Sequence, residues 1–333
     1  MDRLLKYGSV EAIPFYNCSW KSEEEWWTTG VKHPILGLTV LSIGAPIEVL
    51  YCIVIYIIFK TKLIKHACYK IMLLLAVNDM GATVCSSLIT GTLLYQGSVF
   101  CSYPTFTYIS GAFALGTWVT ACAITVSLFA NRIVSIVFQE YADIIEKRLA
   151  YSSMVLSVLY MFYFLIFTPP CVYNSYVMAW IPDPLSEEVP SAEASAWYKN
   201  RPQAWNNWIF VTCMFILFSI YCGLVNKLAR GQKSKASRSI FIQCSIICFF
   251  NTVIALIYNA LPYITLDPWI LIFCQLCWTI NHSLPAVIYV TMNVTIRREF
   301  RKIVFGKIFR IDEKRSSQMT GVVSSAVSSN SRI

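Results

Sequence analysis

The sequence predicts an all-α membrane protein, a bundle of seven transmembrane helices followed by a short amphipathic helix. Its 333 residues are 56% hydrophobic and only 14% charged, whereas soluble domains average about 45–50% and 25%. The apolar residues gather in long blocks, and most lysines and arginines lie between these blocks. An ordinary soluble domain does not have this pattern.

Seven apolar stretches are each long enough to cross a membrane, which takes about 20 residues of helix. The third of them contains no Asp, Glu, Lys, Arg or His, and Arg132 is the second residue after its end. We predict one crossing for each stretch. The stretches are residues 34–59, 69–95, 104–130, 149–173, 206–226, 239–263 and 269–292.

The basic residues predict how the bundle is oriented, because lysine and arginine accumulate in the short cytoplasmic loops of membrane proteins. Four segments, 60–70, 131–148, 227–238 and 291–333, hold 21 of the 27. With seven crossings, the N-terminus is then outside the cell and the C-terminus inside. The sequon Asn17-Cys18-Ser19 agrees with this orientation and predicts glycosylation at Asn17.

The net charge of +9 does not indicate a nucleic-acid partner. A nucleic-acid site needs a basic patch on a folded surface. Here the bases separate apolar runs, so we interpret them as topology signals.

The crossings divide the chain into four parts: residues 1–33 form an extracellular segment, 34–292 the bundle, 293–310 an amphipathic helix and 311–333 a disordered cytoplasmic tail. The loop 174–205 is rich in proline, acids and tryptophan, and is long enough to fold over the outer mouth. The amphipathic helix has apolar residues at helical spacing opposite basic ones, as at a lipid surface. They are Phe300, Ile303, Val304 and Ile308 against Arg297, Arg298, Arg301 and Lys302.

Three ionisable side chains, Glu48, Asp79 and His282, lie well inside apolar runs, where an ionisable residue indicates function. Counted from neighbouring lysines, Glu48 and Asp79 lie about 18 and 14 Å from the inner edge of the membrane. This similar depth permits a shared site, in which one carboxyl is protonated unless a cation or a positive partner is present. A sodium ion, a shared proton and a structural network with amides such as Asn281 all remain open.

Tryptophan and tyrosine concentrate in the outer halves of the crossings. Most of them fit the aromatic belt at a membrane surface. The remainder are candidates to line a pocket for a small molecule. The four candidates are Tyr108, Trp118, Tyr258 and Trp278.

The sequence excludes several enzymatic and cofactor sites. Only His282 of the three histidines lies in a crossing, whereas zinc hydrolases in membranes need several ligands. No lysine occurs from 269 to 296, so a retinal Schiff base has no nucleophile there. Phosphate-binding glycine loops are also absent. We therefore expect neither an enzyme nor a bound metal or cofactor.

Several short strings resemble those of known receptors. Leu-Leu-Ala-Val-Asn-Asp79 resembles the Leu-Ala-x-x-Asp motif of G-protein-coupled receptors, and Asn131-Arg132-Ile133 resembles their Asp-Arg-Tyr motif. Over about residues 15–305 the chain is more closely similar to the nematode serpentine chemoreceptors of class T (Srt). The strings that carry this similarity are GAPIEVLY around Glu48, CYKIMLLL at 68–75, ANR at 130–132 and IYVTMNVTIR at 288–297.

The resemblance implies a chemosensory receptor that binds a small molecule from outside and activates a heterotrimeric G protein. Arg132, Asn131, Tyr221 and Tyr289 would form the coupling switch. Tyr289 is assigned by similarity of Leu-Pro-Ala-Val-Ile-Tyr to a motif, Asn-Pro-x-x-Tyr, that is one residue shorter. Since Asn131 replaces the usual acid, the local salt bridge that restrains Arg132 in such receptors cannot form.

The resemblance also implies a disulfide at Cys101, with Cys171 as the preferred partner and Cys18 as the rival. It implies a multi-pass protein of the plasma membrane, which includes the membrane of sensory cilia. The basic third inner loop would then meet an acidic partner or membrane lipid.

Two other functions remain open. A transporter or channel would use Glu48 and Asp79 to couple ion movement, although no internal repeat is visible. Alternatively, the chain is a subunit or chaperone-like partner of another receptor.

Overall fold

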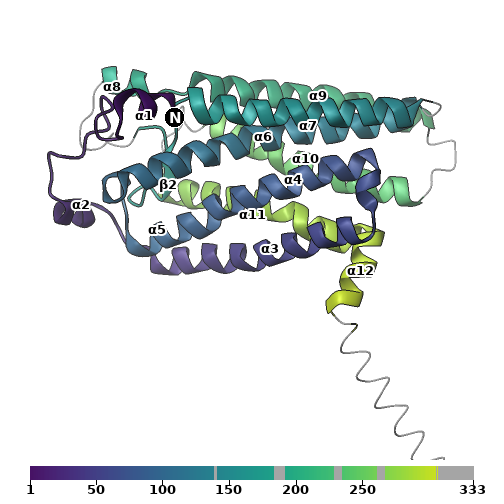
Figure 1. Ribbon diagram of the computed structural model, residues 1–333, viewed down its shortest axis with the longest axis horizontal. Helices are drawn as coiled ribbons and strands as arrows, with labels where there is room; N and C mark the ends of the chain where they lie inside the picture. The colour runs from purple at the N-terminus through teal and green to yellow at the C-terminus, as the bar shows by residue number, and fades with distance from the viewer. Residues whose placement is uncertain (139–140, 184–191, 229–234, 261–266, 305, 307–333) are drawn as a thin grey trace, which may run out of the picture.

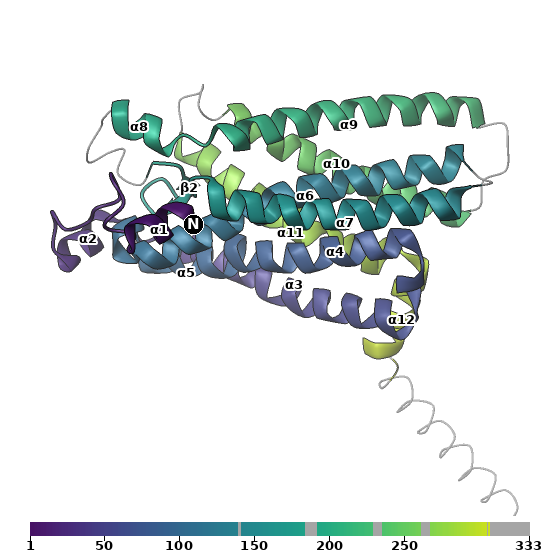
Figure 2. The same cartoon turned by 45° about the horizontal axis from the view of Figure 1, so that its top comes forward.

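The computed structural model is an elongated bundle of long helices along a common axis (Figure 1). It describes residues 1–138, 141–183, 192–228, 235–260, 267–304 and 306. Short N-terminal helices and a β-hairpin gather at one end, and α12 turns away from the axis at the other (Figures 1 and 2).

In chain order, the elements are α1 (Asp2–Tyr7), α2 (Glu23–Thr29), α3 (Pro34–Lys60), η1 (Leu63–Lys65), α4 (Ala67–Thr83), η2 (Val84–Ile89), α5 (Thr90–Gln96), η3 (Phe100–Ser102), α6 (Pro104–Val137), α7 (Ala142–Phe167), β1 (Val172–Asn174), β2 (Ala179–Ile181), α8 (Ala192–Tyr198), α9 (Arg201–Leu228), α10 (Lys235–Ala260), α11 (Pro268–Met292) and α12 (Val294–Val304).

Six helical spans are long and apolar enough to cross a membrane: Pro34–Lys60, Ala67–Gln96, Pro104–Val134, Ile144–Phe167, Arg201–Leu224 and Pro268–Met292. The remaining predicted crossing, 239–263, corresponds to α10, whose apolar part is the shorter Ser245–Ala260. The structure is therefore consistent with a seven-helix bundle.

Local sequence explains where several helices begin and end. α3, α6 and α11 start with a proline in the first turn, where a helix does not use the N–H group. Asp267 caps α11, because its carboxylate accepts a hydrogen bond from the Trp269 N–H at 3.0 Å. α7 ends at Phe167, just before Pro169 and Pro170. The predicted end of the fourth stretch at residue 173 is therefore wrong, because these two prolines stop the helix before it reaches that residue.

α6 lies at the centre of the bundle. Of the residues in its most apolar part, 78% are buried, compared with 22% in α7 and 17% in α9. Those two helices therefore expose most of their apolar surface, as helices in contact with lipid do.

The second crossing is a continuous helix, α4–η2–α5, in which η2 is a π-helical turn. Such a turn interrupts the regular hydrogen-bond pattern of the α-helix. The Ser86 carbonyl accepts hydrogen bonds from Gln275 Nε2 at 2.9 Å and Thr279 Oγ1 at 2.8 Å. Since both side chains lie on α11, the turn joins the second crossing to α11.

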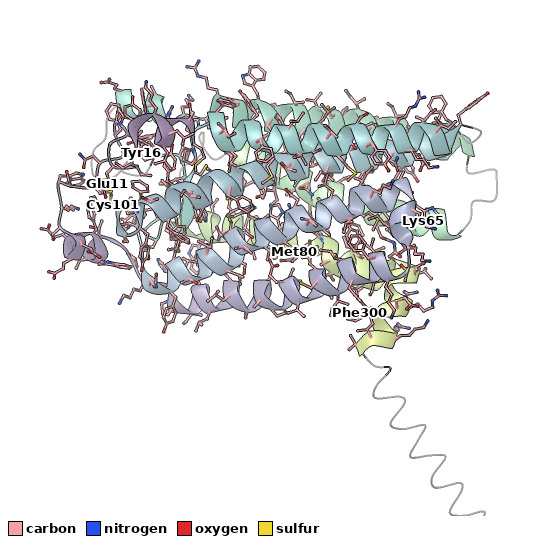
Figure 3. All side chains as sticks on the ribbon, in the orientation of Figure 1. Glu11, Tyr16, Lys65, Met80, Cys101 and Phe300 are labelled. Atoms are coloured by element: carbon pink, nitrogen blue, oxygen red, sulfur yellow. A yellow bond between two sulfur atoms is a disulfide. The ribbon has the colours of Figure 1, made fainter. Side chains whose placement is uncertain are left out.

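We call the end of the bundle with residues 1–33 and the β-hairpin the hairpin end. Tyr16 is buried there, with its ring centroid 5.6, 5.3 and 5.1 Å from those of Phe100, Tyr108 and Tyr198. Burial raises the pKa of Tyr16 well above its usual range, so its hydroxyl stays neutral. Figure 3 shows Tyr16 and Cys101 together at this end.

The chain after α7 lies directly on α6 at Gly111. A Cβ atom added to this glycine would come within 1.6 Å of the Cys171 carbonyl oxygen. Only glycine permits this approach, which brings the β-hairpin over the bundle.

The disulfide at the hairpin end joins Cys18 to Cys101. The predicted Cys101–Cys171 pair is therefore wrong, and the rival partner Cys18 takes its place. The N-terminal segment packs its buried aromatic residues against η3 and the start of α6, which brings Cys18 beside Cys101. Cys171 is a free thiol, 3.9 Å from Gln203 Oε1 on α9.

The opposite end, which we call the arginine end because it carries Arg132, also holds α12. Asn293 separates α11 from α12 and caps α12, since its Oδ1 accepts a hydrogen bond from the Ile296 N–H at 3.2 Å. Phe300 and Ile303 of α12 pack against the core, and Figure 3 shows Phe300 at this end. The predicted amphipathic helix is thus present.

One residue of the predicted amphipathic helix lies in a different environment from the one expected, and part of the C-terminal prediction lies outside the described residues. Val304, expected on the apolar face, is exposed because it is the last residue of α12. Ile308 and the predicted tail 311–333 lie outside the described residues.

We predict that a Cys18–Cys101 peptide is found when the unreduced protein is digested and analysed by mass spectrometry. Cys18→Ser should lower the free energy of unfolding by about 4 kcal/mol, because the disulfide closes a long loop. Cys171→Ser is the matched control and should leave the stability nearly unchanged. A Cys101–Cys171 peptide would contradict the pairing.

Candidate functional site

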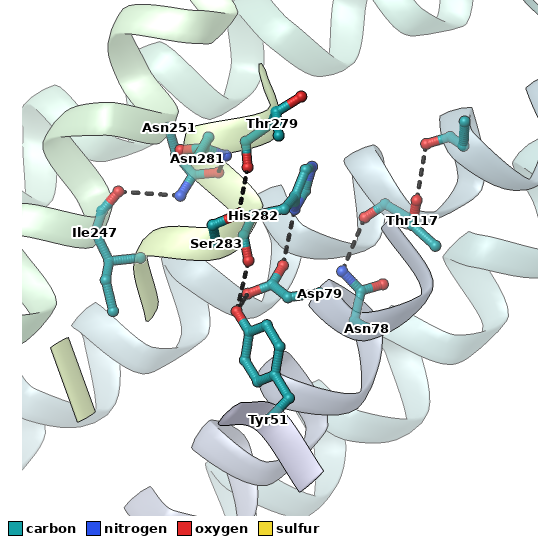
Figure 4. A network of polar contacts seen from close by, with 11 residues as sticks. Tyr51, Asn78, Asp79, Thr117, Ile247, Asn251, Thr279, Asn281, His282 and Ser283 are labelled. Carbon is teal, nitrogen blue, oxygen red and sulfur yellow. Dashed lines mark hydrogen bonds and ion pairs between the residues drawn. The ribbon is translucent and has the colours of Figure 1, made fainter. Parts of the chain in front are cut away.

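A buried polar centre lies midway along the bundle. Asp79 Oδ1 on α4 lies 2.9 Å from His282 Nδ1 on α11, and both side chains are almost fully buried. The Tyr51 hydroxyl on α3 lies 3.3 Å from Asp79 Oδ2 and 2.6 Å from the His282 carbonyl oxygen. Figure 4 shows these three side chains converging from three helices.

Amide side chains extend this centre to two further helices. Asn281 Nδ2 donates to Asn251 Oδ1 on α10 at 3.2 Å, and Asn78 Nδ2 donates to the Thr117 carbonyl on α6 at 3.0 Å (Figure 4). The polar centre therefore connects α3, α4, α6, α10 and α11.

Glu48 is not hydrogen-bonded to Asp79. Its Oε1 atom is buried and has no hydrogen-bond partner among the described residues. The shared carboxylate site that similar depth permitted is therefore not formed. Asp79 instead takes His282, the third ionisable residue inside the predicted crossings, as its partner.

A cavity lies between the polar centre and the β-hairpin. It encloses about 420 Å³ of space between atoms, including space open to solvent. Three tryptophans, a tyrosine and a glutamine line it together with small and apolar residues. The lining residues are Gly111, Ala114, Leu115, Trp118, Cys171, Trp180, Gln203, Tyr258 and Trp278.

Three of the four aromatic residues suggested for a pocket, Trp118, Tyr258 and Trp278, line this cavity. Tyr108 does not, because it packs against Tyr16 at the hairpin end. On α6, residues 111, 114, 115 and 118 line the cavity, at the spacing of one helix face. This spacing along one helix face is a sequence signal that identifies the α6 side of the cavity.

Trp180 and Gln203 also line the cavity, and sequence analysis did not identify them. Trp180 lies opposite Tyr173 in the antiparallel hairpin. Trp180 comes from the loop after the fourth crossing, whose path over the bundle has no periodic sequence signal, and Gln203 lies in the first turn of α9, just before the predicted fifth crossing. Only the fold brings them to the cavity.

Two tryptophans connect the cavity to the polar centre. The His282 ring lies edge-to-face with Trp118 and Trp278, at centroid distances of 6.2 and 6.3 Å. Both tryptophans are cavity-lining residues. A molecule that displaces either ring would therefore press on His282 and, through it, on Asp79.

Arg132 at the arginine end is hydrogen-bonded to its neutral neighbour. Arg132 Nη2 donates to Asn131 Oδ1 at 2.9 Å, and Asn131 Nδ2 lies 3.4 Å from the Glu146 carbonyl on α7. The Arg132 guanidinium also contacts the Cys68 thiol at the start of α4. An uncharged amide thus occupies the place where an acid would form a salt bridge.

The two predicted switch tyrosines lie on different helices. Tyr221 on α9 packs edge-to-face on Phe129 of α6 at 6.1 Å, one turn before Arg132. Tyr289 on α11 is fully buried in the core.

The predicted glycosylation site is accessible. Asn17 is exposed at the hairpin end, next to the disulfide at Cys18. Among the described residues, no group of three His, Cys, Asp or Glu side chains is arranged to hold a metal ion.

We predict that His282→Ala lowers the free energy of unfolding by about 1–3 kcal/mol, because Asp79 then loses its buried partner. Thermal unfolding of the purified protein measures this change. The control is His66→Ala, which removes an exposed histidine and should have little effect. Equal stability of the two variants would mean that the buried contact contributes nothing.

Comparison with known proteins agrees with these observations. The sequence model of the family described as "Serpentine type 7TM GPCR chemoreceptor Srt" matches residues 3–313. The chain is also similar to serpentine receptor class T-55 of Caenorhabditis elegans, with 23% identity over 321 residues, which cover 94% of this chain and 86% of that protein. The resemblance and the expectation of a receptor, not an enzyme, are confirmed. The chain is a multi-pass membrane protein and belongs to the Srt family of serpentine seven-transmembrane G-protein-coupled chemoreceptors.

Proposed function

We propose that the protein is a chemosensory receptor that binds a small molecule in the cavity and activates a heterotrimeric G protein at the arginine end. The contact of Trp118 and Trp278 with both the cavity and His282 is the observation that carries this proposal. It gives a bound molecule a direct mechanical connection to the polar centre.

We infer that the hairpin end is extracellular. The disulfide supports this, because disulfides persist in oxidising compartments. The exposed sequon at Asn17 and the basic residues around the other end also support it. On this orientation, residues 1–33 are extracellular, 34–292 form the bundle, 293–310 lie at the inner surface and 311–333 are cytoplasmic.

The proposed transmission runs along α6. Trp118 at the cavity and Arg132 at the inner end lie on this one helix, about 21 Å apart along its axis. A ligand that binds one arrangement of the bundle more tightly shifts the population toward that arrangement. Opening of the inner face between Arg132, Tyr221 and Tyr289 would then admit the G protein.

α12 and the basic inner loops supply the proposed contact with lipid. Arg301 and Lys302 lie in the last turn of α12, while its apolar side packs on the bundle. Anionic lipid headgroups at the inner surface attract such bases. We place the receptor in the plasma membrane, with sensory cilia as the expected site in a chemosensory cell.

We predict that Arg132→Ala abolishes ligand-dependent G-protein activation without reducing surface expression. The variant removes the charge proposed to meet the G protein. Arg148→Ala is the matched control, since it removes an exposed arginine of α7 on the same side of the bundle. Second-messenger output in cells, with surface labelling, measures both effects. Unchanged signalling by Arg132→Ala would reject the coupling role.

We predict that Asn131→Asp lowers basal signalling by about fivefold, because a carboxylate binds Arg132 more strongly than an amide does, by about 1 kcal/mol. Asn131→Ala removes the hydrogen bond and should raise basal signalling. Both are measured without ligand, at equal surface expression. A rise with Asn131→Asp would mean that another group restrains Arg132.

A further inference from the structure

The cavity limits the size of its ligand. The space between atoms is about 420 Å³, including space open to solvent, which is near the lower end of the range for small-molecule sites. This volume suits a compact molecule. Ala114 contributes to the available space, because it is one of the smallest residues of the lining.

The cavity offers uncharged surfaces. Among its described lining residues, none carries a carboxylate, ammonium, guanidinium or imidazole group. Two of the indole N–H groups are already used: Trp118 Nε1 donates to Asn207 Oδ1 at 2.9 Å, and Trp180 Nε1 donates to Thr90 Oγ1 at 2.8 Å. These tryptophans therefore present apolar ring atoms to a ligand.

The remaining polar groups of the cavity can donate hydrogen bonds. Gln203 Oε1 accepts a weak hydrogen bond from the Cys171 thiol, 3.9 Å away, whereas no described residue accepts one from Gln203 Nε2. The Tyr258 hydroxyl is a second donor in the cavity lining. An oxygen atom that accepts hydrogen bonds is the ligand group that satisfies such donors.

A cation is less suited to this cavity. Aromatic faces attract a cation by about 0.5–2 kcal/mol, but burial of a charge without a counter-charge costs several kcal/mol. The described lining has no acid to offset that cost.

We propose that the ligand is a small, uncharged, mostly apolar molecule whose carbonyl or ether oxygen accepts a hydrogen bond from Gln203. This inference rests on the proposed function, since it names the ligand class of the same cavity. Gln203 would determine specificity, and the aromatic rings would supply most of the contact area.

Binding of four probes of similar size tests the ligand class: acetophenone, α-methylstyrene, benzylammonium and benzoate. The first two differ only in a carbonyl oxygen replaced by a methylene group. Tryptophan fluorescence of the purified full-length protein in lipid nanodiscs reports binding. We expect acetophenone to bind most tightly, and Gln203→Leu to weaken its binding about tenfold while sparing α-methylstyrene. Gln96→Leu, outside the cavity lining, is the matched control.

Ala114→Phe separates the two proposals, because it fills the cavity and should abolish binding of every probe. Suppose that Ala114→Phe abolishes binding of every probe. The cavity is then the site, but the ligand class is wrong if benzylammonium or benzoate binds the wild-type protein best, or if Gln203→Leu leaves acetophenone binding unchanged. If binding survives Ala114→Phe, the cavity is not the site and the proposed function loses its support. Absence of binding by acetophenone would also overturn the ligand class.

Discussion

The bundle depends on the buried contact between Asp79 and His282. Inside a membrane bundle, water does not compete for such groups, so each must find its partner within the protein. Because Tyr51 also contacts Asp79, one carboxylate fixes α3, α4 and α11 relative to one another. A displacement of His282 must therefore move α11 against two neighbouring helices at once. The rings of Trp118 and Trp278 lie where such a displacement would begin.

The two ends of the bundle are held by interactions of different strength. A disulfide and a buried cluster around Tyr16 hold the hairpin end, and the disulfide alone is worth about 4 kcal/mol. Among the described residues the arginine end has no disulfide, and one of its contacts is the hydrogen bond from Arg132 Nη2 to the Asn131 amide, of a kind worth on the order of 1–3 kcal/mol. Because the covalent link is at the hairpin end and motion concentrates where local stability is lowest, we expect the arginine end to rearrange before the hairpin end does.

The sequence predicted those features that depend on composition and period. The apolar runs, the amphipathic helix and three cavity aromatics, Trp118, Tyr258 and Trp278, all follow from such local patterns. The partner of Cys101 did not, because it depends on how residues 1–33 pack. The partner of Asp79 was also missed, since depth alone does not tell which faces of two helices meet. Trp180 and Gln203 reach the cavity only through the path that the chain takes from the hairpin to the start of α9.

The π-helical turn η2 has a consequence for how much the sequence of this region can vary. Gln275 and Thr279 of α11 bond to the backbone carbonyl of Ser86, and not to its side chain. Replacement of the serine by another small residue therefore preserves both hydrogen bonds, whereas deletion of one residue from the turn removes the geometry that exposes the carbonyl. The contact between these two crossings is thus sensitive to chain length and tolerant of residue identity, so distant homologues can keep the same helix arrangement while their side chains differ.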